Sequence, residues 1–358
     1  MIHRTDPARQ APWQAELATA IRDPEALVRA LGLPDTLLAA ARRAHAHFPV
    51  RVPPAYLARI RPGDPEDPLL RQILPLDLEE APKPGFSKDP VGDLAAQVAP
   101  GVLHKYEGRV LLTATGACAI HCRYCFRRHF PYADAQAARD GWARATAHLA
   151  ADPSIREVIL SGGDPLTLSD DRLAGLMGAL HAMAHIKRVR LHSRVPVVIP
   201  SRVNEGLLAW LEETPLAVVM VLHINHPREV DEAVIRACAR LRAARVTLLN
   251  QAVLLAGVND DAEVLAALSE RVFEAGVLPY YLHMLDRVEG AAHFAVDAAR
   301  ALGLMEVLRA RLPGYLVPRL VREEAGAPAK VPVAAVGAVG AVGAVGAVGA
   351  VGADPGCR

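Results

Sequence analysis

The sequence predicts an α/β fold: a partial (β/α)6 barrel of the TIM type, with an N-terminal helical cap and a disordered, low-complexity C-terminal tail. From about residue 108, short runs rich in β-branched residues alternate with longer amphipathic stretches. This alternation is typical of parallel strands joined by right-handed helical crossovers. The runs are almost entirely apolar, which indicates a sheet covered on both faces or closed into a barrel. Six such units are too few for a complete barrel.

The pattern of the first hundred residues predicts short helices interrupted by prolines. One helix is expected over Pro24–Leu31, with Asp23 as its N-cap and Pro24 in the first helical position. On this basis we expect four parts: a cap over residues 1–100, the barrel over 101–325, a short segment over 326–333 and the tail over 334–358.

The elements of the barrel are expected in a regular order, with polar residues at the strand ends. The predicted strands are Val110–Thr115, Glu157–Ser161, Val189–His192, Ala217–Ile224, Val246–Leu255 and Leu278–Leu285. The predicted helices are Ala133–Ala151, Asp170–His185, Glu229–Ala244, Ala262–Ala275 and Ala292–Arg311. At or after the strand ends stand Cys118, Gly162-Gly163-Asp164, Arg194, His223, Asn225, His226, Asn250-Gln251, His283 and Asp286. Because α/β barrels place their sites at the C-terminal ends of the strands, these residues predict a site.

Composition limits the classes of function. Apolar residues make up 52% of the chain and the formal net charge is +1, so no global field attracts nucleic acid or an anionic membrane. The first residues carry charges and no apolar run, so no signal peptide is expected and the cytoplasm is the predicted compartment. From about Ala335 to Ala353 the chain repeats Ala-Val-Gly. Glycine at every third position weakens a helix by about 1 kcal/mol each, which favours a disordered tail over a membrane anchor. Cys357 in that tail has no assigned role.

Three of the five cysteines lie within eight residues. Cys118, Cys122 and Cys125, with three and two residues between them, can bind one face of a [4Fe–4S] cluster and leave one iron open for an amino-acid ligand. The alternative is a zinc site with His121 or His129 as its fourth ligand. Three buried structural thiols are a poor explanation, because arginines stand among and beside the cysteines: Arg123, Arg127 and Arg128.

The cysteine spacing, with an aromatic residue before the last cysteine, resembles the radical S-adenosylmethionine superfamily. The string Cys122-Arg-Tyr-Cys-Phe-Arg-Arg-His-Phe-Pro-Tyr is similar to the lysine 2,3-aminomutase family, above all to its members that supply β-lysine for modification of translation elongation factor P. The resemblance extends from about Phe48 to Val333. It includes Leu-Ser-Gly-Gly-Asp-Pro-Leu, His-Ile-Asn-His-Pro, Asn-Gln-Ala-Val-Leu-Leu-Ala-Gly-Val-Asn-Asp and Pro-Tyr-Tyr-Leu-His.

The resemblance implies two sets of cofactor contacts. For S-adenosylmethionine it implies Gly162, Gly163, Asp164, His223 and Asn225, although the glycine pair could equally form a tight turn between strand and helix. For pyridoxal phosphate it implies Lys330 as the covalently bound lysine, with Lys105, Arg109 and Gln251 as polar contacts. Lys105 stands where the clostridial-type enzymes of the family have arginine, so a point charge replaces a bidentate group. Taken alone, these basic residues could also be surface charges.

The resemblance also implies a substrate. Arg127 would pair with the carboxylate of an amino acid, and Asp286 and Glu323 with an ammonium group at its far end. The family commonly has aspartate at the position of Glu323, and Glu324 competes for the assignment. The implied reaction is an isomerisation that moves the α-amino group of L-lysine to the β carbon and yields β-lysine.

Several partners and rival functions accompany this prediction. The implied partners are an electron donor such as flavodoxin or ferredoxin and an elongation factor P β-lysine ligase. Association of the chain into a homo-oligomer is left open. One rival is the same chemistry on free lysine or glutamate in metabolism. The other, from a different class, is a zinc-binding non-catalytic module.

Overall fold

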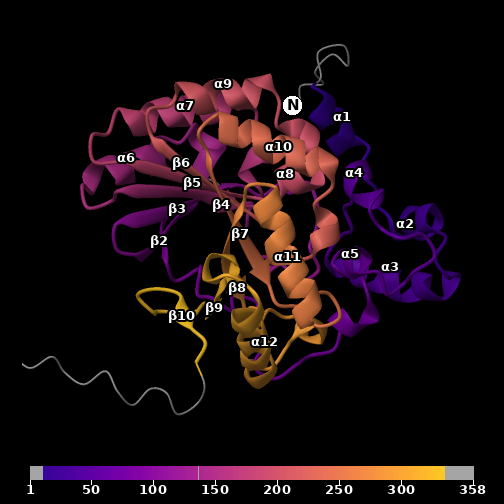
Figure 1. Ribbon diagram of the computed structural model, residues 1–358. Coiled ribbons are helices and arrows are strands. Elements are labelled where there is room, and N and C mark those ends of the chain that lie inside the picture. The colour runs from indigo at the N-terminus through magenta and orange to yellow at the C-terminus, as the bar shows by residue number, and fades with distance from the viewer. Residues whose placement is uncertain (1–10, 136, 335–358) are drawn as a thin grey trace, which may run out of the picture.

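The centre of the molecule is one ten-stranded sheet in which the strands follow one another in chain order (Figure 1). The structure is a computed structural model that describes residues 11–135 and 137–334. Seven successive strands, β3 to β9, pair in parallel. Antiparallel hairpins extend the sheet at both edges, β1–β2–β3 at one and β9–β10 at the other. The predicted mixed α/β fold with a mostly parallel, partial-barrel sheet is confirmed.

The six predicted strands correspond to β3 to β8. The bounds are β1 Gln97–Ala99, β2 Val102–Tyr106, β3 Arg109–Thr115, β4 Glu157–Gly162, β5 Arg188–Ser193, β6 Ala217–Leu222, β7 Thr247–Val253, β8 Leu278–His283, β9 Arg319–Arg322 and β10 Val331–Pro332. Strands β6, β7 and β8 end two residues earlier than predicted, and there the chain leaves the sheet carrying polar residues. The hairpins and β9 were not predicted, because these strands are too short to show a period.

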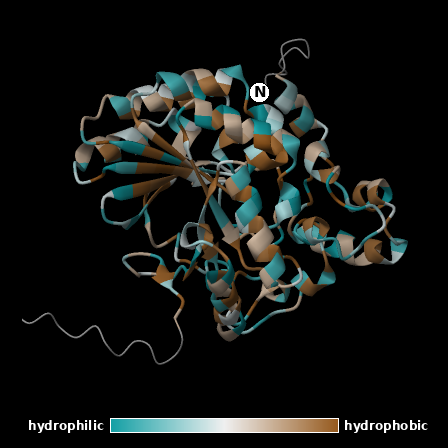
Figure 2. Ribbon diagram, viewed as in Figure 1, coloured by the Kyte–Doolittle hydropathy of each residue, from teal (hydrophilic) through white to brown (hydrophobic). Residues whose placement is uncertain are grey.

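The crossover helices cover the sheet (Figure 1). Their bounds are α6 Ala143–Ala151, α7 Asp170–His181, α8 Val195–Val198, α9 Glu205–Glu213, α10 Glu232–Ala243, α11 Ala262–Glu274 and α12 Ala298–Arg311. The helix predicted over Ala133–Ala151 is wrong in its first part, since Gly141 and Trp142 have φ values of 67° and 74° and α6 begins only after them. The strands carry both apolar and polar segments, and β6 is apolar along its whole length, whereas the helices alternate apolar and polar residues (Figure 2).

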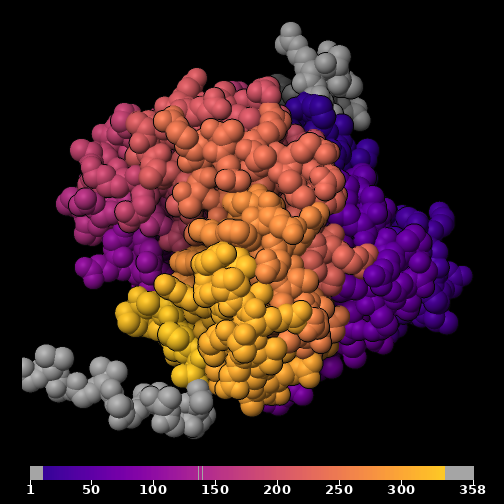
Figure 3. Space-filling view, in the orientation of Figure 1, coloured from indigo at the N-terminus to yellow at the C-terminus, as the bar shows by residue number. Residues whose placement is uncertain are grey.

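The cap consists of short helices packed along one side of the sheet (Figures 1 and 3). Their bounds are α1 Pro12–Ala18, α2 Pro24–Leu31, α3 Leu38–His47, α4 Pro54–Leu57 and α5 Pro68–Arg71. The predicted helix Pro24–Leu31 is confirmed, and the Asp23 carboxylate accepts the N–H of Ala26 at 3.0 Å. Buried residues of the cap, such as Leu27 and Leu69, belong to the same apolar core as Leu112 and Leu160 of the sheet.

No helix within the described residues has the length and apolar character that crossing a bilayer requires. The Ala-Val-Gly repeat and Cys357 lie outside the described residues.

Candidate active site

The loop after β3 carries the three predicted cluster ligands. Cys118, Cys122 and Cys125 are free thiols, each partly buried. The N–H of Cys125 donates to the carbonyl of Cys122 at 3.0 Å, which closes a tight turn. The N–H of Arg123 donates to the carbonyl of Gln72 in the cap at 2.9 Å. The loop is therefore fixed between the sheet and the cap.

The three thiols influence one another. Burial raises the pKa of Cys118 well above its usual range, and the neighbouring Cys125 and Cys122 raise it further. Burial, with Cys122 adding to it, raises the pKa of Cys125 to about 11. Thiols in such surroundings lose their protons when a metal cation stabilises the thiolates. Three cysteines that leave one iron open fit a [4Fe–4S] cluster.

The two histidines considered as zinc ligands contact other groups. Nδ1 of His121 is 2.7 Å from the carbonyl oxygen of Pro49, and Nε2 of His129 is 3.1 Å from that of Glu289. Among the described residues, no three His, Cys, Asp or Glu side chains are arranged to hold a single metal ion. A cubane cluster does not require that arrangement, because its cysteines bind different iron atoms. Both histidines considered as a fourth zinc ligand are therefore engaged by backbone carbonyls.

Glu79 of the cap holds the same loop through two arginines. Its Oε1 accepts from Nε of Arg123 at 2.8 Å, and its Oε2 accepts from Arg123 and from Arg128, each at 2.6 Å. All three side chains are buried, and both guanidinium groups lie over the ring of Phe48. Glu79 was not predicted, because no local pattern marks a partner 44 residues away in the sequence.

The glycine pair at the end of β4, Gly162 and Gly163, lies directly against the cysteine loop. A Cβ on Gly163 would come within 2.3 Å of the carbonyl oxygen of Ala117, and Gly162 has a φ of 108°. The N–H of Gly163 donates to the carbonyl of Thr115 at 2.7 Å. The pair therefore lets the β4 turn pack against the loop without side chains between them. A contact with S-adenosylmethionine stays a prediction.

The Asp164 carboxylate is used within the protein. Its Oδ1 accepts from the Ser193 hydroxyl at 2.8 Å, and its Oδ2 accepts the N–H of Arg194 at 2.7 Å. Burial raises the pKa of Asp164 to about 6. In this structure Asp164 fixes the start of the loop after β5.

His223 and Asn225, after β6, meet the cysteine loop at Tyr124. The Tyr124 hydroxyl lies 2.8 Å from Nε2 of His223 and accepts from Nδ2 of Asn225 at 2.7 Å. Burial, followed by the nearby Arg194, lowers the pKa of His223 to about 3, so the imidazole is neutral. His223 also hydrogen-bonds to the backbone of Gln251, where the β7–β8 register shifts. His223 and Asn225 thus contact Tyr124, which lies between Cys122 and Cys125 in the sequence, and Gln251 neighbours His223.

A second group of predicted residues forms a continuous series of ion pairs, which we call the charge chain. Lys330 pairs with Glu323 at 2.7 Å, and Glu323 pairs with Lys105 at 3.0 Å. Lys105 pairs with Asp93 at 2.6 Å, and Asp93 pairs with Arg127 at 2.7 Å. Burial acts to raise the pKa of Glu323, but Lys330 and Lys105 outweigh it and lower the pKa to about 2. The charge chain joins the predicted pyridoxal lysine to the predicted substrate arginine.

Two further predicted residues lie at the edge of the charge chain. Burial, with Glu323 adding to it, raises the pKa of Asp286 to about 7. Arg109 lies over the ring of Tyr106, with its guanidinium carbon 4.6 Å from the ring centre, and the Tyr106 hydroxyl neighbours Glu323. Arg109 is thus separated from Glu323 by one aromatic ring.

Near Lys330, one ring nitrogen of each of two histidines is buried without a hydrogen-bond partner among the described residues. Nε2 of His192 and Nε2 of His283 are shielded from solvent and unpaired within the part of the chain that the structure describes. Burial lowers the pKa of both well below the usual range, and Lys330 lowers it further for each. Two neutral imidazoles with free nitrogens beside a lysine fit a polar ligand such as pyridoxal phosphate. His283 was predicted as a strand-end residue of the site without a specific role, whereas His192 was not predicted as a site residue.

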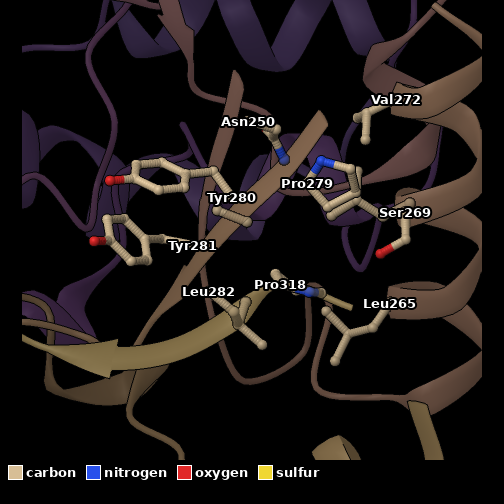
Figure 4. Close-up of a pocket in the computed structure, with 11 residues that line it drawn as sticks. Asn250, Leu265, Ser269, Val272, Pro279, Tyr280, Tyr281, Leu282 and Pro318 are labelled. Atoms are coloured by element: carbon tan, nitrogen blue, oxygen red, sulfur yellow. The ribbon is translucent and has the colours of Figure 1, made fainter. Parts of the chain in front are cut away.

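A pocket between β8 and α11 lies apart from these groups. It is lined by residues such as Pro279, Tyr280 and Leu265, and the rings of Tyr280 and Tyr281 lie side by side at its edge (Figure 4). Of the strand-end residues that predict a site, only Asn250 lines it, and none of the predicted cofactor or substrate contacts does. We attribute this pocket to the packing of α11 on the sheet.

Comparison with known proteins gives the family. No protein-family model matches the chain. The L-lysine 2,3-aminomutase of Escherichia coli is 48% identical over 91% of this chain and 95% of that protein. The enzyme of the same name from Haemophilus influenzae is 46% identical over 89% and 94%. That from Buchnera aphidicola is 39% identical over 89% and 94%. The chain belongs to the lysine 2,3-aminomutase family.

Membership of the lysine 2,3-aminomutase family gives the reaction class, because an aminomutase is an isomerase. It also implies an iron–sulfur cluster and S-adenosylmethionine, which agrees with the three thiols of the cysteine loop. The resemblance recognised in the sequence is confirmed by these relatives.

Proposed function

We propose that this chain converts L-lysine to β-lysine with a [4Fe–4S] cluster, S-adenosylmethionine and pyridoxal phosphate. The observation that supports this most is the charge chain, which connects Lys330 with Arg127, two residues after Cys125. The cluster loop and the cofactor lysine thereby belong to one site. A non-catalytic zinc module would need no such connection.

The charges of the site suit lysine at both ends. Arg127 is buried, also donates to the Ser161 hydroxyl at 3.1 Å, and can pair with the α-carboxylate. Asp286 and Glu323 can take the ammonium group at the far end. Glutamate would bring its second carboxylate toward these same two acids, so the site disfavours it.

The protein's own residues bind the cofactors, orient the substrate and shield the site from water. When bound, the cluster and S-adenosylmethionine would supply the radical that removes hydrogen from the β carbon, and pyridoxal phosphate would supply the covalent attachment of the substrate nitrogen during its migration. Lys330 would carry that cofactor, and His192 and His283 offer it neutral polar contacts. Gln72 and Tyr124, both buried, close the cap over the cysteine loop and keep water from it.

The proposal includes the setting of the reaction. Cysteines kept as iron ligands suit a reducing compartment, so we place the protein in the cytoplasm. A flavodoxin or ferredoxin would supply electrons, and a ligase would attach β-lysine to elongation factor P. Deleting the gene should remove the β-lysyl mass from elongation factor P; if the modification persists, the product serves metabolism instead.

The deciding assay is anaerobic incubation with L-lysine, S-adenosylmethionine and a strong reductant, followed by amino-acid analysis. We expect β-lysine from lysine and no β-glutamate from glutamate. Lys330→Ala should abolish both the product and the bound pyridoxal absorbance, while iron and sulfide content stay at the parent's level. Protein that contains zinc without iron or sulfide, or a cluster-loaded parent that leaves lysine unchanged, would reject the proposal.

A further inference from the structure

Arg194, after β5, contacts one of the three cluster thiols directly. The side chain is 6% exposed. One terminal nitrogen donates to Sγ of Cys122 at 2.8 Å and to the Tyr124 hydroxyl at 2.9 Å. Among the described residues, neither Cys118 nor Cys125 accepts a side-chain hydrogen bond at its sulfur. The three thiols are thus unequal, because one of them has a buried cation against it.

A buried carboxylate holds Arg194 in place. The other terminal nitrogen donates to Oε2 of Glu229 at 2.8 Å, to Oε1 of Gln72 at 2.7 Å and to the Tyr56 hydroxyl at 3.4 Å. Glu229 is fully buried. Its Oε1 accepts from Nε2 of Gln72 at 3.1 Å and from the N–H groups of Asn225 and His226, at 3.0 and 3.1 Å. Since Glu229 is so fully hydrogen-bonded, the guanidinium has one defined position.

The guanidinium also has an unused donor. Nε of Arg194 is buried and has no hydrogen-bond partner among the described residues. A buried, unpaired donor on a group already bonded to a thiol indicates that an acceptor is missing beside Cys122. A sulfide of the cluster and the carboxylate of S-adenosylmethionine both have that chemistry.

We propose that Arg194 raises the reduction potential of the cluster by donating to the Cys122 thiolate, and that Glu229 limits this increase. The inference depends on the cluster of the proposed function. Reduction adds one electron, taken from an external reductant, to the cluster, and no bond forms or breaks. A cation and a hydrogen-bond donor at a ligand sulfur stabilise the reduced, more negative form. A buried anion next to that cation opposes this effect.

The test compares two variants of the same hydrogen-bond network, Arg194→Gln, which removes a positive charge, and Glu229→Gln, which removes a negative charge. Parent, Arg194→Gln and Glu229→Gln are reconstituted without oxygen, and the reduced cluster is followed by EPR in a redox titration without S-adenosylmethionine. For Arg194→Gln we expect the ratio of reduced to oxidised cluster at a fixed potential to fall at least tenfold, which is about 59 mV for one electron. For Glu229→Gln the ratio should rise. Arg202→Gln is the matched control: Arg202 is fully buried and paired with Asp170, without contact to a cysteine, so its variant should keep the parent potential.

Unchanged potentials, or shifts of the same sign in Arg194→Gln and Glu229→Gln, would overturn the inference. If Arg194→Gln assembles no cluster, the potentials of Glu229→Gln and Arg194→Lys test the inference instead. For Arg194→Lys we expect a lower reduction potential than in the parent, because this variant loses the guanidinium donor to Cys122. If Arg194→Gln lost affinity for S-adenosylmethionine while the reduction potential stayed unchanged, Arg194 would be only a contact for that ligand. This result would also reject the inference. The parent's iron, sulfide and β-lysine formation test the proposed function separately, so the two failures are distinguishable.

Discussion

Asp93 joins two residues to which the proposed function gives different tasks. Its two carboxylate oxygens pair separately with Lys105, a proposed phosphate contact, and with Arg127, a proposed substrate contact. The side chain is 2% exposed and comes from the chain before the first strand of the sheet. Asp93 was not predicted, because its position in the sequence gives no sign that it reaches the site.

We expect Asp93→Asn to raise KM for lysine and to weaken pyridoxal phosphate binding. The variant leaves Lys105 and Arg127 without their shared counter-ion, and hydrogen bonds to charged groups are worth about 1.5–3 kcal/mol, or roughly tenfold or more in affinity. Steady-state kinetics and a cofactor titration measure both effects. Asp77→Asn, which removes an exposed cap carboxylate paired with Arg43, is the control. Equal KM values in the two variants would show that Asp93 does not position the site.

Asp286 should make stability depend on pH. Burial raises its pKa to about 7, whereas an aspartate in the unfolded chain has a pKa of about 3.9. The folded state therefore favours the protonated acid, and this contribution to stability is lost as the pH rises through about 7. The free energy of unfolding of Asp286→Asn, relative to the parent, should accordingly rise between these two values.

Glu323 provides the control of opposite sign. Its pKa is lowered to about 2 by Lys330 and Lys105 against the effect of burial. Its contribution to stability is present above the unfolded pKa of about 4.3 and is lost as the pH falls toward about 2. Glu323→Gln should therefore be less stable than the parent at neutral pH. Denaturation curves over a pH series check both variants, and parallel curves for parent and Asp286→Asn would contradict the first expectation.

At the scale of elements, the turn after β4 and the loop after β3 depend on each other. The turn has no side chain where it meets the carbonyl of Ala117, and the N–H of Asp164 donates to that same carbonyl at 2.8 Å. The cysteine loop therefore keeps its position partly because β4 is followed by glycines.

Gly163→Ala should displace the cysteine loop. The added Cβ would lie 2.3 Å from the carbonyl oxygen of Ala117, closer than atoms can approach, and overpacking of this kind costs about 1–3 kcal/mol. We expect less iron bound per chain and a lower Tm.

Gly175→Ala is the matched control for Gly163→Ala. Gly175 lies inside α7 with open space around its added Cβ. Alanine is favoured over glycine in a helix by about 0.5–1 kcal/mol, so this variant should keep its iron and melt slightly higher. Equal iron content in the two variants would show that the turn does not hold the loop.

At the scale of the molecule, the cap and the sheet share one apolar core. Leu27 of the cap and Leu160 of the sheet belong to the same group of buried residues, and Glu79 of the cap binds the arginines of the cysteine loop. Elements that share a core unfold together. We expect a single thermal transition, seen at the same temperature by circular dichroism and by the tryptophan fluorescence of Trp13 in the cap and Trp210 in the barrel. Two separate transitions would show that the cap is an independent domain.

The sequence by itself determined the order of the elements and the identity of the chemistry. The apolar runs of β3 to β8 and the spacing of Cys118, Cys122 and Cys125 are local patterns, and they need no distant partner to be recognised. The family followed from strings of neighbouring residues for the same reason. The break before α6 falls at Asp140-Gly141, a dipeptide typical of turns, but the alanines on both sides favour a continuous helix.

Only the tertiary structure decided which charges meet. Arg127 and Lys330 are some two hundred residues apart, and Asp93, Lys105 and Glu323 connect them through ion pairs. The hydrogen bond from Arg194 to Cys122 likewise spans 72 residues. Such pairings depend on how strands and cap pack, and the free energy of a buried charge depends on partners that no local pattern specifies. Many residues of the site could be predicted from the sequence, but Asp93 and the ion pairs that it completes required the fold.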